Sequence, residues 1–372
     1  MQRKCKRTIC LSMLVIGVLC PIWVYASSVP SLVTSYLVSY IREVDTLEFC
    51  GEKIPLQLEE IRERFEKEFL LILWNRPQVI LWLKRANRYF SFLERVLNEN
   101  SVPDDLKYVA IIESALRPHI RSRKGAVGFW QFMAGTGREY GLKINRHIDE
   151  RRNFFASSRA AIRYFKKLHE LFGSWTLAVS AFNMGEKGLK AEILEQGTAD
   201  FFQLYLPLET QRFLFRIISV KLIFSDPFKY GFNLDKEDYY HRLSFDRIKL
   251  KSVDQIPIRI IAQAAKTQFK VIKNLNPEIR GHYLVSGNHD ILIPKGASEG
   301  FHKRFQALFE NYLTKNKKHV YIVKKGDNLS LIANRFNISL ATLIIWNRLD
   351  FRRPIHPGDR LIVYPVKKGS KN

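Results

Sequence analysis

Cysteine is scarce in this sequence, and the positions of the four that occur argue against a disulfide-stabilised fold. Cys5, Cys10 and Cys20 lie close to the N-terminus, and the rest of the 372-residue chain contains only Cys50. If the first residues are removed as a leader, Cys50 has no partner and no intramolecular disulfide can form, even in an oxidising compartment. The fold must then depend on packed hydrophobic cores, and the chain is long enough to form two or three of them.

Long hydrophobic runs are also absent, except near the start of the chain. The stretch MQRKCKR is basic, the following TICLSMLVIGVLCPIW is apolar, and small Ala26 ends the segment. This order predicts a secretory signal peptide over residues 1–26, cleaved near Ala26, and export to the periplasm or cell envelope. A retained membrane anchor is the alternative, although the run is short for a helix that spans a bilayer. Lipid attachment at Cys20 is disfavoured because bulky Leu19 stands where a small residue is expected.

Acidic residues are few relative to basic ones, with 36 Asp and Glu against 60 Lys and Arg, which gives a formal charge of +24. This balance favours a polyanionic partner such as nucleic acid, an anionic membrane face or an acidic cell-wall polymer. The basic residues are scattered, without a long Lys/Arg tract or a zinc-finger spacing. Since the leader predicts export, we expect no nucleic-acid partner.

Metal-ligand spacings are missing from the sequence as well. His119 and His147 have no partner at the spacing that a metal site requires, so we expect neither a metal nor another cofactor. No motif in the sequence identifies an obligate protein partner.

The pattern of apolar residues divides the rest of the chain into regions. Residues 27–100 and 101–235 repeat apolar positions at helical spacing, with one break at the letters NRP. Gly173 and Gly185 are expected to end two of these helices. Beyond residue 245 the apolar runs are shorter, and Pro, Gly and β-branched residues punctuate them. We therefore expect a mainly helical region followed by small modules that contain strands.

The C-terminal region contains a faint internal repeat. Ile261 precedes Asn276 by the same interval as Ile332 precedes Asn347, and one constant offset relates the two stretches. Each copy predicts a strand–helix–helix–strand module. The two predicted modules span residues 245–300 and 319–365.

A single acidic residue, Glu113, lies on the apolar face of a predicted helix. Leu106 and Val109 precede it at the spacing of one helical face, and we expect a capping box of Ser101 and Asp104 to begin the helix. An unpaired carboxylate among hydrophobic residues resists ionisation, because burial disfavours the charged form. A carboxylic acid that stays protonated near neutral pH is suited to act as a general acid.

The stretch ESALRPHIRSRKGAVGFWQFM, residues 113–133, resembles the family-1 lytic transglycosylases, the murein transglycosylases related to goose-type lysozyme. The family pattern of Glu-Ser, Pro, Ser, Gly-Ala-x-Gly and Gln-x-Met is met in order and spacing, and the blocks TGREYGL, DERRN and SWTLAVSAFNMG also agree with it. Over about residues 45–235 the sequence is most similar to the D-type, membrane-bound branch. The resemblance implies a mainly α, lysozyme-like catalytic domain of the α+β superfamily over residues 101–235, preceded by an N-terminal helical region.

Residues 319–365 resemble a LysM domain, a βααβ module that binds glycans containing N-acetylglucosamine. The stretches YIVKKGDNLSLIA, WN and IHPGDRLIVYP stand where that family has its first strand and helix, its Trp-Asn pair and its last strand. The copy at 245–300 lacks the Gly-Asp-x-Leu loop, and we expect it to be a degenerate LysM-like module. The resemblance implies glycan binding by two loops, which contain Gly326, Asp327, Asn328, Leu329, Asn347 and Ile355.

The resemblance also implies a reaction on peptidoglycan glycan strands. Enzymes of this family cleave the β-1,4 bond between N-acetylmuramic acid and N-acetylglucosamine and leave a 1,6-anhydromuramic acid end. Glu113 is expected to protonate the leaving oxygen and then, as a carboxylate, to take the proton of the muramic acid C6 hydroxyl. Because that hydroxyl closes onto C1, a second carboxylate, which most glycosidases need, is not required.

Four more residues are expected, from the resemblance, to bind substrate: Ser122, Gln131, Phe182 and Asn183. For Ser122 and Gln131 the alternative is a role in loop structure and capping, and for Asn183 a structural role is equally well supported. Phe182 departs from the family, which has Tyr at this position. The missing hydroxyl would forfeit about 1–3 kcal/mol if its hydrogen bond assists the transition state.

Three classes of function are compatible with the sequence. We favour a transglycosylase that its LysM domain targets to the cell wall. A hydrolase of the same fold would need a positioned water and a second carboxylate, such as Asp149 or Glu150. A wall-binding protein with a weak or inactive enzyme domain is the third class, which the change at Phe182 keeps open.

Overall fold

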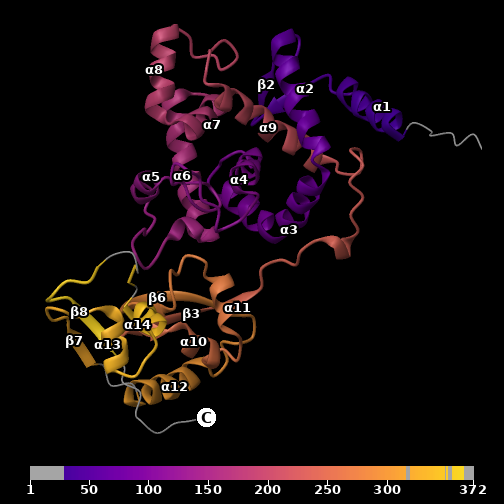
Figure 1. The fold of residues 1–372 in the computed structure, drawn as a ribbon. Coiled ribbons are helices and arrows are strands. Elements are labelled where there is room, and N and C mark those ends of the chain that lie inside the picture. Colours follow the sequence, from indigo (N-terminus) through magenta and orange to yellow (C-terminus); the bar gives the residue numbers. More distant parts are fainter. Residues whose placement is uncertain (1–28, 316–318, 348, 351–353, 364–372) are drawn as a thin grey trace, which may run out of the picture. The chain divides into compact units, whose positions relative to one another are not determined.

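The computed structural model describes residues 29–315, 319–347, 349–350 and 354–363, and Figure 1 labels most of its helices and strands. The predicted signal peptide, residues 1–26, lies outside these residues. The chain divides into a unit that ends at Val44 and a second unit from Asp45 onward. Helix α1, Val29–Arg42, belongs to the first unit.

The second unit begins with an antiparallel hairpin of β1 (Leu47–Phe49) and β2 (Glu52–Ile54). The sequence patterns did not predict this hairpin, because strands of three residues are too short to show a period. Eight α-helices follow up to residue 225. They are α2 (Glu59–Trp74), α3 (Arg76–Glu99), α4 (Lys107–Ser114), α5 (Ala134–Glu139), α6 (Phe154–Phe172), α7 (Trp175–Met184), α8 (Glu186–Gln196) and α9 (Leu208–Ser225).

Three predicted helix ends are confirmed. Asn75 separates α2 from α3, at the predicted break. Gly173 ends α6 with a φ of 71°, and Gly185 ends α7 with a φ of 94°. Both glycines hold positive φ angles, which residues with a Cβ adopt only at a cost.

The core of the helical region forms where α2 and α4 pack against α9. Helix α2 buries Phe65 and Phe69 and also the carboxylate of Glu68. Arg212 and Arg216 of α9 donate to that carboxylate through their Nε atoms, at 2.5 and 3.0 Å. A buried charge is tolerated because it is paired in this way.

The start of α4 differs from the prediction. Ser101 has a φ of 55°, whereas a helix N-cap needs an extended backbone, so no capping box forms. A 3-10 turn, η1 (Asp104–Leu106), comes first, and α4 begins at Lys107. The nearly buried Lys107 ammonium donates to the carboxylate of Asp104 at 2.6 Å and to that of Glu94 at 2.7 Å, so Asp104 serves an ion pair instead of the backbone.

Residues 245–294 form a strand–helix–helix–strand module. The long strands β3 (Phe245–Ser252) and β6 (Gly287–Pro294) pair antiparallel, with Asp246 opposite Ile293. Helix α12 (Phe301–Lys315) packs on α10 and extends the module beyond the predicted repeat. The remaining elements of the module are β4 (Ile256–Pro257), α10 (Ile258–Ala264), α11 (Phe269–Leu275) and β5 (Tyr283–Leu284).

The last module has the same order of elements around a smaller core. Its strands β7 (His319–Ile322) and β8 (Arg360–Val363) pair antiparallel, and its helices are α13 (Leu329–Arg335) and α14 (Leu340–Asn347). Across the described ranges no helix alone meets the length and hydropathy of a bilayer span, although α13 and α14 together, bent by 104°, do so by length and composition.

A buried or half-buried asparagine joins the second helix to the last strand in each module. Asn276 accepts from the Leu292 N–H and donates to the Leu292 carbonyl, both at 2.8 Å. Asn347 makes the same pair of bonds with Ile362, at 2.6 and 2.8 Å. The two helices and the asparagine of one module are related to those of the other by the constant offset of the sequence repeat. The strand residues that the asparagines bond, Leu292 and Ile362, are not related by that offset. Counted from the asparagine to the strand residue that it bonds, the second copy is one residue shorter.

Candidate active site

Glu113 lies in the last turn of α4. The helix ends there because Ala115 and Leu116 adopt left-handed backbone angles, with φ of 54° and 56°. The Glu113 side chain is half-buried. Burial, and to a smaller extent the negative charge of Glu209, raise its pKa from 4.5 to about 8. At neutral pH this carboxyl is mostly protonated, as the sequence analysis expected of a general acid.

The neighbouring Ser114 fixes the end of α4 to the loop that contains Gln131. Its hydroxyl donates to the Phe129 carbonyl at 2.8 Å and is itself buried. The loop is anchored on its other side by Trp130, whose indole N–H donates to the Ser158 hydroxyl at 3.0 Å. Residues 120–132, which we call the substrate loop, are thus held against α4 and α6.

Gln131 has a φ of 46°, and its side-chain amide closes the substrate loop. The Nε2 group donates to the Ile120 carbonyl at 3.2 Å and to the Gly128 carbonyl at 2.8 Å. These bonds use both amide hydrogens, so a glycan could contact only the Oε1 atom of this side chain. The structure thus gives Gln131 a role in the loop, and its contact with substrate stays a prediction.

A buried ion pair holds the substrate loop through hydrogen bonds to the backbone of the loop. Arg151, in the 3-10 turn η2 (Glu150–Arg152), binds the Asp149 carboxylate at 2.8 and 2.9 Å. Its guanidinium also donates to the carbonyls of Gly125 and Phe132, at 3.2 and 3.1 Å. Burial alone would raise the pKa of Asp149, but the hydrogen bonds and charge of Arg151 hold it below its ordinary value.

Gly128 is the point of closest approach between the substrate loop and η2. Its φ is +87°, and a Cβ built there would lie 1.8 Å from the carbonyl oxygen of Arg151. Only glycine allows this backbone path. Gly128 is the second glycine of the Gly-Ala-x-Gly motif, and this close approach to η2 explains why a glycine is needed there.

Ser122 closes the exposed end of the substrate loop. Its hydroxyl accepts from the Ala126 N–H at 3.0 Å, and its own N–H donates to the Ala126 carbonyl at 3.0 Å. The side chain is exposed. These bonds do not test whether Ser122 contacts a glycan, so that contact stays a prediction.

Helix α7 contributes Phe182 and Asn183. The Phe182 ring stacks on Phe165 at 4.5 Å and lies 6.0 Å from the ring of Phe132 in the substrate loop. Asn183 accepts through Oδ1 from the Thr210 hydroxyl at 2.9 Å. Since Thr210 follows Glu209 at the start of α9, this bond places Asn183 beside the residue whose charge acts on Glu113.

Glu209 and Thr210 were missed by the sequence analysis. Glu209 is exposed, follows Pro207 and lies in the first turn of α9, where acidic residues are common for reasons of helix stability alone. Its carboxylate accepts from Arg216 at 2.8 Å, and Arg216 also binds Glu68. No local pattern could have indicated the electrostatic effect on Glu113, because it depends on how α4 and α9 pack.

The predicted LysM residues lie in the last module, where most of their side chains support the fold. Asp327 accepts from the Tyr321 hydroxyl at 2.6 Å, and Asn328 caps α13 by accepting from the Leu331 N–H at 2.8 Å. Leu329 and Ile355 pack on the small core, and Asn347 bonds to β8. Gly326 is exposed with a φ of +88°. Any glycan contacts of the Gly326–Asn328 loop would therefore come mainly from its backbone groups.

Two protein families match parts of this chain. The Transglycosylase SLT domain family matches residues 90–204, which contain Glu113 and the substrate loop. The LysM domain family matches residues 321–363. This chain carries a transglycosylase SLT domain and a LysM domain. The resemblance read from the sequence motifs, and the fold class that it implied, are confirmed.

Two relatives are also similar to this chain. The chain is homologous to "Membrane-bound lytic murein transglycosylase D" of Escherichia coli K12, with 29% identity over 333 residues, which is 86% of this chain and 72% of the relative. A "Putative tributyltin chloride resistance protein" of Alteromonas sp. M-1 is 31% identical over 110 residues, 29% of this chain and 53% of that protein.

Two solved structures also resemble parts of the chain. An inactive variant of lytic transglycosylase Slt from Pseudomonas aeruginosa is 20% identical, with a TM-score of 0.32 over 42% of this chain and 26% of its own. The 70 kDa soluble lytic transglycosylase of Escherichia coli is 15% identical, with a TM-score of 0.34 over 57% of this chain and 37% of its own.

Proposed function

We propose that this protein is a peptidoglycan lytic transglycosylase that cleaves the β-1,4 bond between N-acetylmuramic acid and N-acetylglucosamine. The observation that carries the proposal is the partial burial and raised pKa of the Glu113 carboxyl within an SLT domain. Its carboxyl is half-buried at a helix end, and its pKa is raised to about 8, so it can donate a proton at neutral pH. The homologous murein transglycosylase D supports the substrate class.

The proposed reaction uses Glu113 twice. The protonated carboxyl gives its proton to the glycosidic oxygen, and the N-acetylglucosamine side leaves with that oxygen as a hydroxyl. The new carboxylate then takes the proton of the C6 hydroxyl as O6 bonds to C1, which forms the 1,6-anhydro ring. Glu113 ends the cycle protonated and no water is consumed. A pKa near the operating pH suits both transfers.

The carboxylates that a hydrolase of this fold would use are engaged elsewhere. Asp149 is almost fully buried in its ion pair with Arg151. Glu150 accepts from the Lys143 N–H at 2.6 Å. Asp149 is thus held in a structural ion pair and Glu150 has one oxygen in a structural bond, which favours the internal C6 hydroxyl as the nucleophile.

Phe182 gives a reason to keep the weak or inactive enzyme as a second candidate. Its ring nevertheless packs in an aromatic cluster with Phe165 and Tyr164, at 4.5 and 5.5 Å between ring centres. This packing needs no hydroxyl, so Phe keeps the position that the ring of a Tyr would take in the site. We therefore propose an active enzyme.

We also propose that the LysM domain holds the enzyme on the cell wall. The excess of basic residues, with a formal charge of +24 over the whole chain, suits an acidic wall polymer. Residues 1–26 would direct export to the periplasm or cell envelope, with cleavage near Ala26.

Digestion of purified peptidoglycan, followed by mass spectrometry of the soluble fragments, tests this function. The wild-type protein should release fragments one water lighter than reducing-end fragments. Glu113→Gln keeps the shape of the side chain but cannot transfer the proton, so the rate should fall by about 10² to 10⁴ or more. Glu150→Gln is the matched control, because the amide oxygen can still accept from Lys143.

Each contrary result has a distinct meaning. Reducing-end products from the wild type would identify a hydrolase. Peptidoglycan binding without soluble products would identify an inactive wall-binding protein. A near wild-type rate for Glu113→Gln would remove Glu113 from the mechanism.

A further inference from the structure

The segment that follows α11, residues 276–281, lies against the SLT domain. Ile279 and Ile148 form an antiparallel bridge. The Asp149 N–H donates to the Glu278 carbonyl at 2.9 Å, and the Arg280 N–H donates to the His147 carbonyl at 2.8 Å. Backbone pairing of this kind fixes the position of one segment relative to the other.

Side chains reinforce the backbone pairing. Asn153 donates through Nδ2 to the Glu278 carboxylate at 2.9 Å, while its Oδ1 accepts from the Ala156 N–H at 2.9 Å and caps α6. The Glu278 side chain is only 6% exposed, and this burial raises its pKa to about 7. Arg280 donates to the Asn145 carbonyl at 3.3 Å. A buried carboxyl group that takes a side-chain donor from the opposite domain is costly to disturb.

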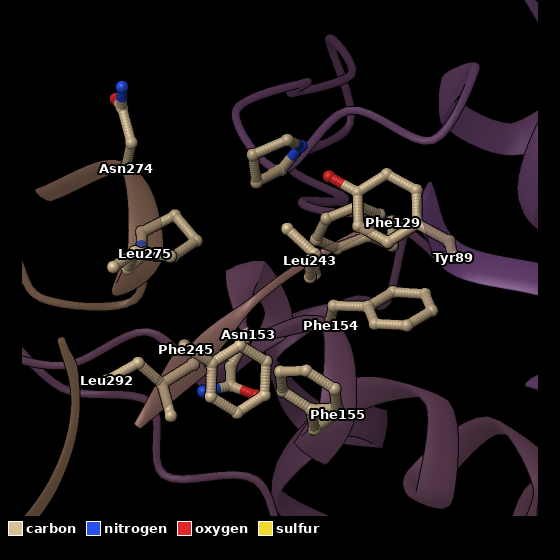
Figure 2. Close-up of a pocket in the computed structure, with 12 residues that line it drawn as sticks. Tyr89, Phe129, Asn153, Phe154, Phe155, Leu243, Phe245, Asn274, Leu275 and Leu292 are labelled. Atoms are coloured by element: carbon tan, nitrogen blue, oxygen red, sulfur yellow. The ribbon is translucent and has the colours of Figure 1, made fainter. Parts of the chain in front are cut away.

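Apolar side chains complete this contact. A cavity of about 40 Å³ is lined from both sides, with Phe129 and Phe155 from the SLT domain and Phe245 and Leu275 from the module. Figure 2 shows these side chains. The rings of Phe155 and Phe245 meet edge to face at 5.4 Å. A cavity of this size has no room for a sugar ring, so we interpret the contact as a packed interface.

The SLT residues that this interface fixes also support the substrate loop. Asp149, which is paired with Glu278 through its backbone, holds Arg151 through its side chain. Arg151 in turn binds the carbonyls of Gly125 and Phe132 in the loop. Direct contacts therefore run from the module to the loop that contains Gln131.

The segment of the LysM domain that corresponds to residues 276–281 has a different predicted role. By the constant offset of the repeat, Asn276 corresponds to Asn347, so residues 276–281 correspond to the start of the 347–355 loop. That loop is one of the two in which the LysM resemblance places glycan contacts. In the first module the same segment is already bound to the SLT domain.

We propose that the module of residues 245–315 is a positioning module for catalysis. Its segment 276–281 binds SLT residues 147–153 in place of a glycan and so holds the substrate loop in its active geometry. Glu278 and Asn153 are then positioning residues that act through Arg151. The proposal rests on the proposed transglycosylase function and deepens it.

Three variants of the full-length protein test this role on soluble, uncross-linked glycan strands. Glu278→Ala removes the acceptor for Asn153, and we expect kcat to fall about tenfold with KM changed less than twofold, since small misplacements of a site lower the rate strongly. Glu278→Gln keeps an acceptor oxygen and should stay within about twofold of wild type. Glu299→Ala, an exposed residue of the same module, is the control and should match wild type.

Hydrogen exchange provides the readout that separates positioning from general destabilisation. In Glu278→Ala the amides of Val127 and Gly128, which bond to Phe132 and Ile120 within the loop, should exchange faster, while those of α2 and α9 should not change. If Glu278→Ala does not fold, Asn153→Asp keeps the α6 cap and removes the donor, and the same division between kcat and KM is expected.

The inference and the proposed function fail in different ways. Absence of anhydro products from the wild type would contradict the function. Normal anhydro products with kcat and loop exchange equal in Glu278→Ala and wild type would overturn the positioning role alone. A rise in KM with unchanged kcat would instead identify residues 276–281 as a glycan-binding site and would also overturn it.

Discussion

The modules at 245–315 and 319–363 share the strand–helix–helix–strand order but have different surroundings. In both, an asparagine at the end of the second helix bonds to the last strand through its side-chain amide. Asn276 is fully buried, and its module has the additional helix α12 and the interface with the SLT domain. Asn347 is half-buried, and its module has a smaller core.

The βααβ fold alone therefore does not assign a function to either module. The two modules differ in the segment after their second helix and in the loop before their first helix. The first module has SVDQIP before α10, and its later segment pairs with residues 147–149. The second has the Gly326–Asp327 loop, whose glycine holds a φ of +88°. We therefore expect the first module to serve catalysis and the second to serve wall binding.

Alanine at the two corresponding asparagines should have the largest and most clearly different effects. Asn276→Ala leaves the N–H and carbonyl of buried Leu292 unpaired, at a cost of about 1–3 kcal/mol for each group. We expect it to lower both the unfolding temperature and turnover on soluble strands. Asn347→Ala should reduce retention on insoluble peptidoglycan and leave turnover on soluble strands within about twofold.

Scanning calorimetry, turnover and sedimentation with peptidoglycan measure these effects in the full-length protein. Asn288→Ala, an exposed residue on β6, is the matched control. Equal losses of turnover in Asn276→Ala and Asn347→Ala would contradict the division of roles.

Local patterns predicted the parts of the fold that depend on near neighbours in sequence. The helical face of Glu113, the helix ends at Gly173 and Gly185, and the repeat of Asn276 in Asn347 all follow from periods, glycine punctuation or self-similarity. These signals lie within a few turns of each element.

The remaining features depend on contacts between distant segments. The bond between Asn153 and Glu278 joins residues 125 positions apart, and the effect of Glu209 on Glu113 needs α4 to pack on α9. No local pattern contains these partners.

We also expect turnover and wall retention to depend differently on pH. This effect should be smaller than the effects of the two asparagine variants. Glu113 donates a proton only while protonated, so turnover should fall as the pH rises through its pKa of about 8. Glu209→Gln removes a negative charge that raises this pKa, and the fall should begin at a lower pH. The shift should be smaller than that caused by burial, which is the larger cause.

Turnover and wall retention measured from pH 5 to 10 on wild type and Glu209→Gln check this expectation. Glu192→Gln, on α8, serves as a second charge-removing variant. Retention through the LysM domain should not follow the Glu113 transition. An alkaline limb that is unchanged in Glu209→Gln would show that this carboxylate does not act on Glu113.

Hydrogen exchange of the full-length protein with and without N-acetylglucosamine oligomers tests the division of roles most directly. Glycan binding slows exchange where the ligand covers or orders backbone amides. We predict slower exchange at residues 326–329 and 347–355, and no change at residues 276–281, where the Arg280 N–H and the Glu278 carbonyl are already bonded to the SLT domain. Slower exchange at residues 276–281 on adding the oligomers, with none at residues 326–329, would contradict the account.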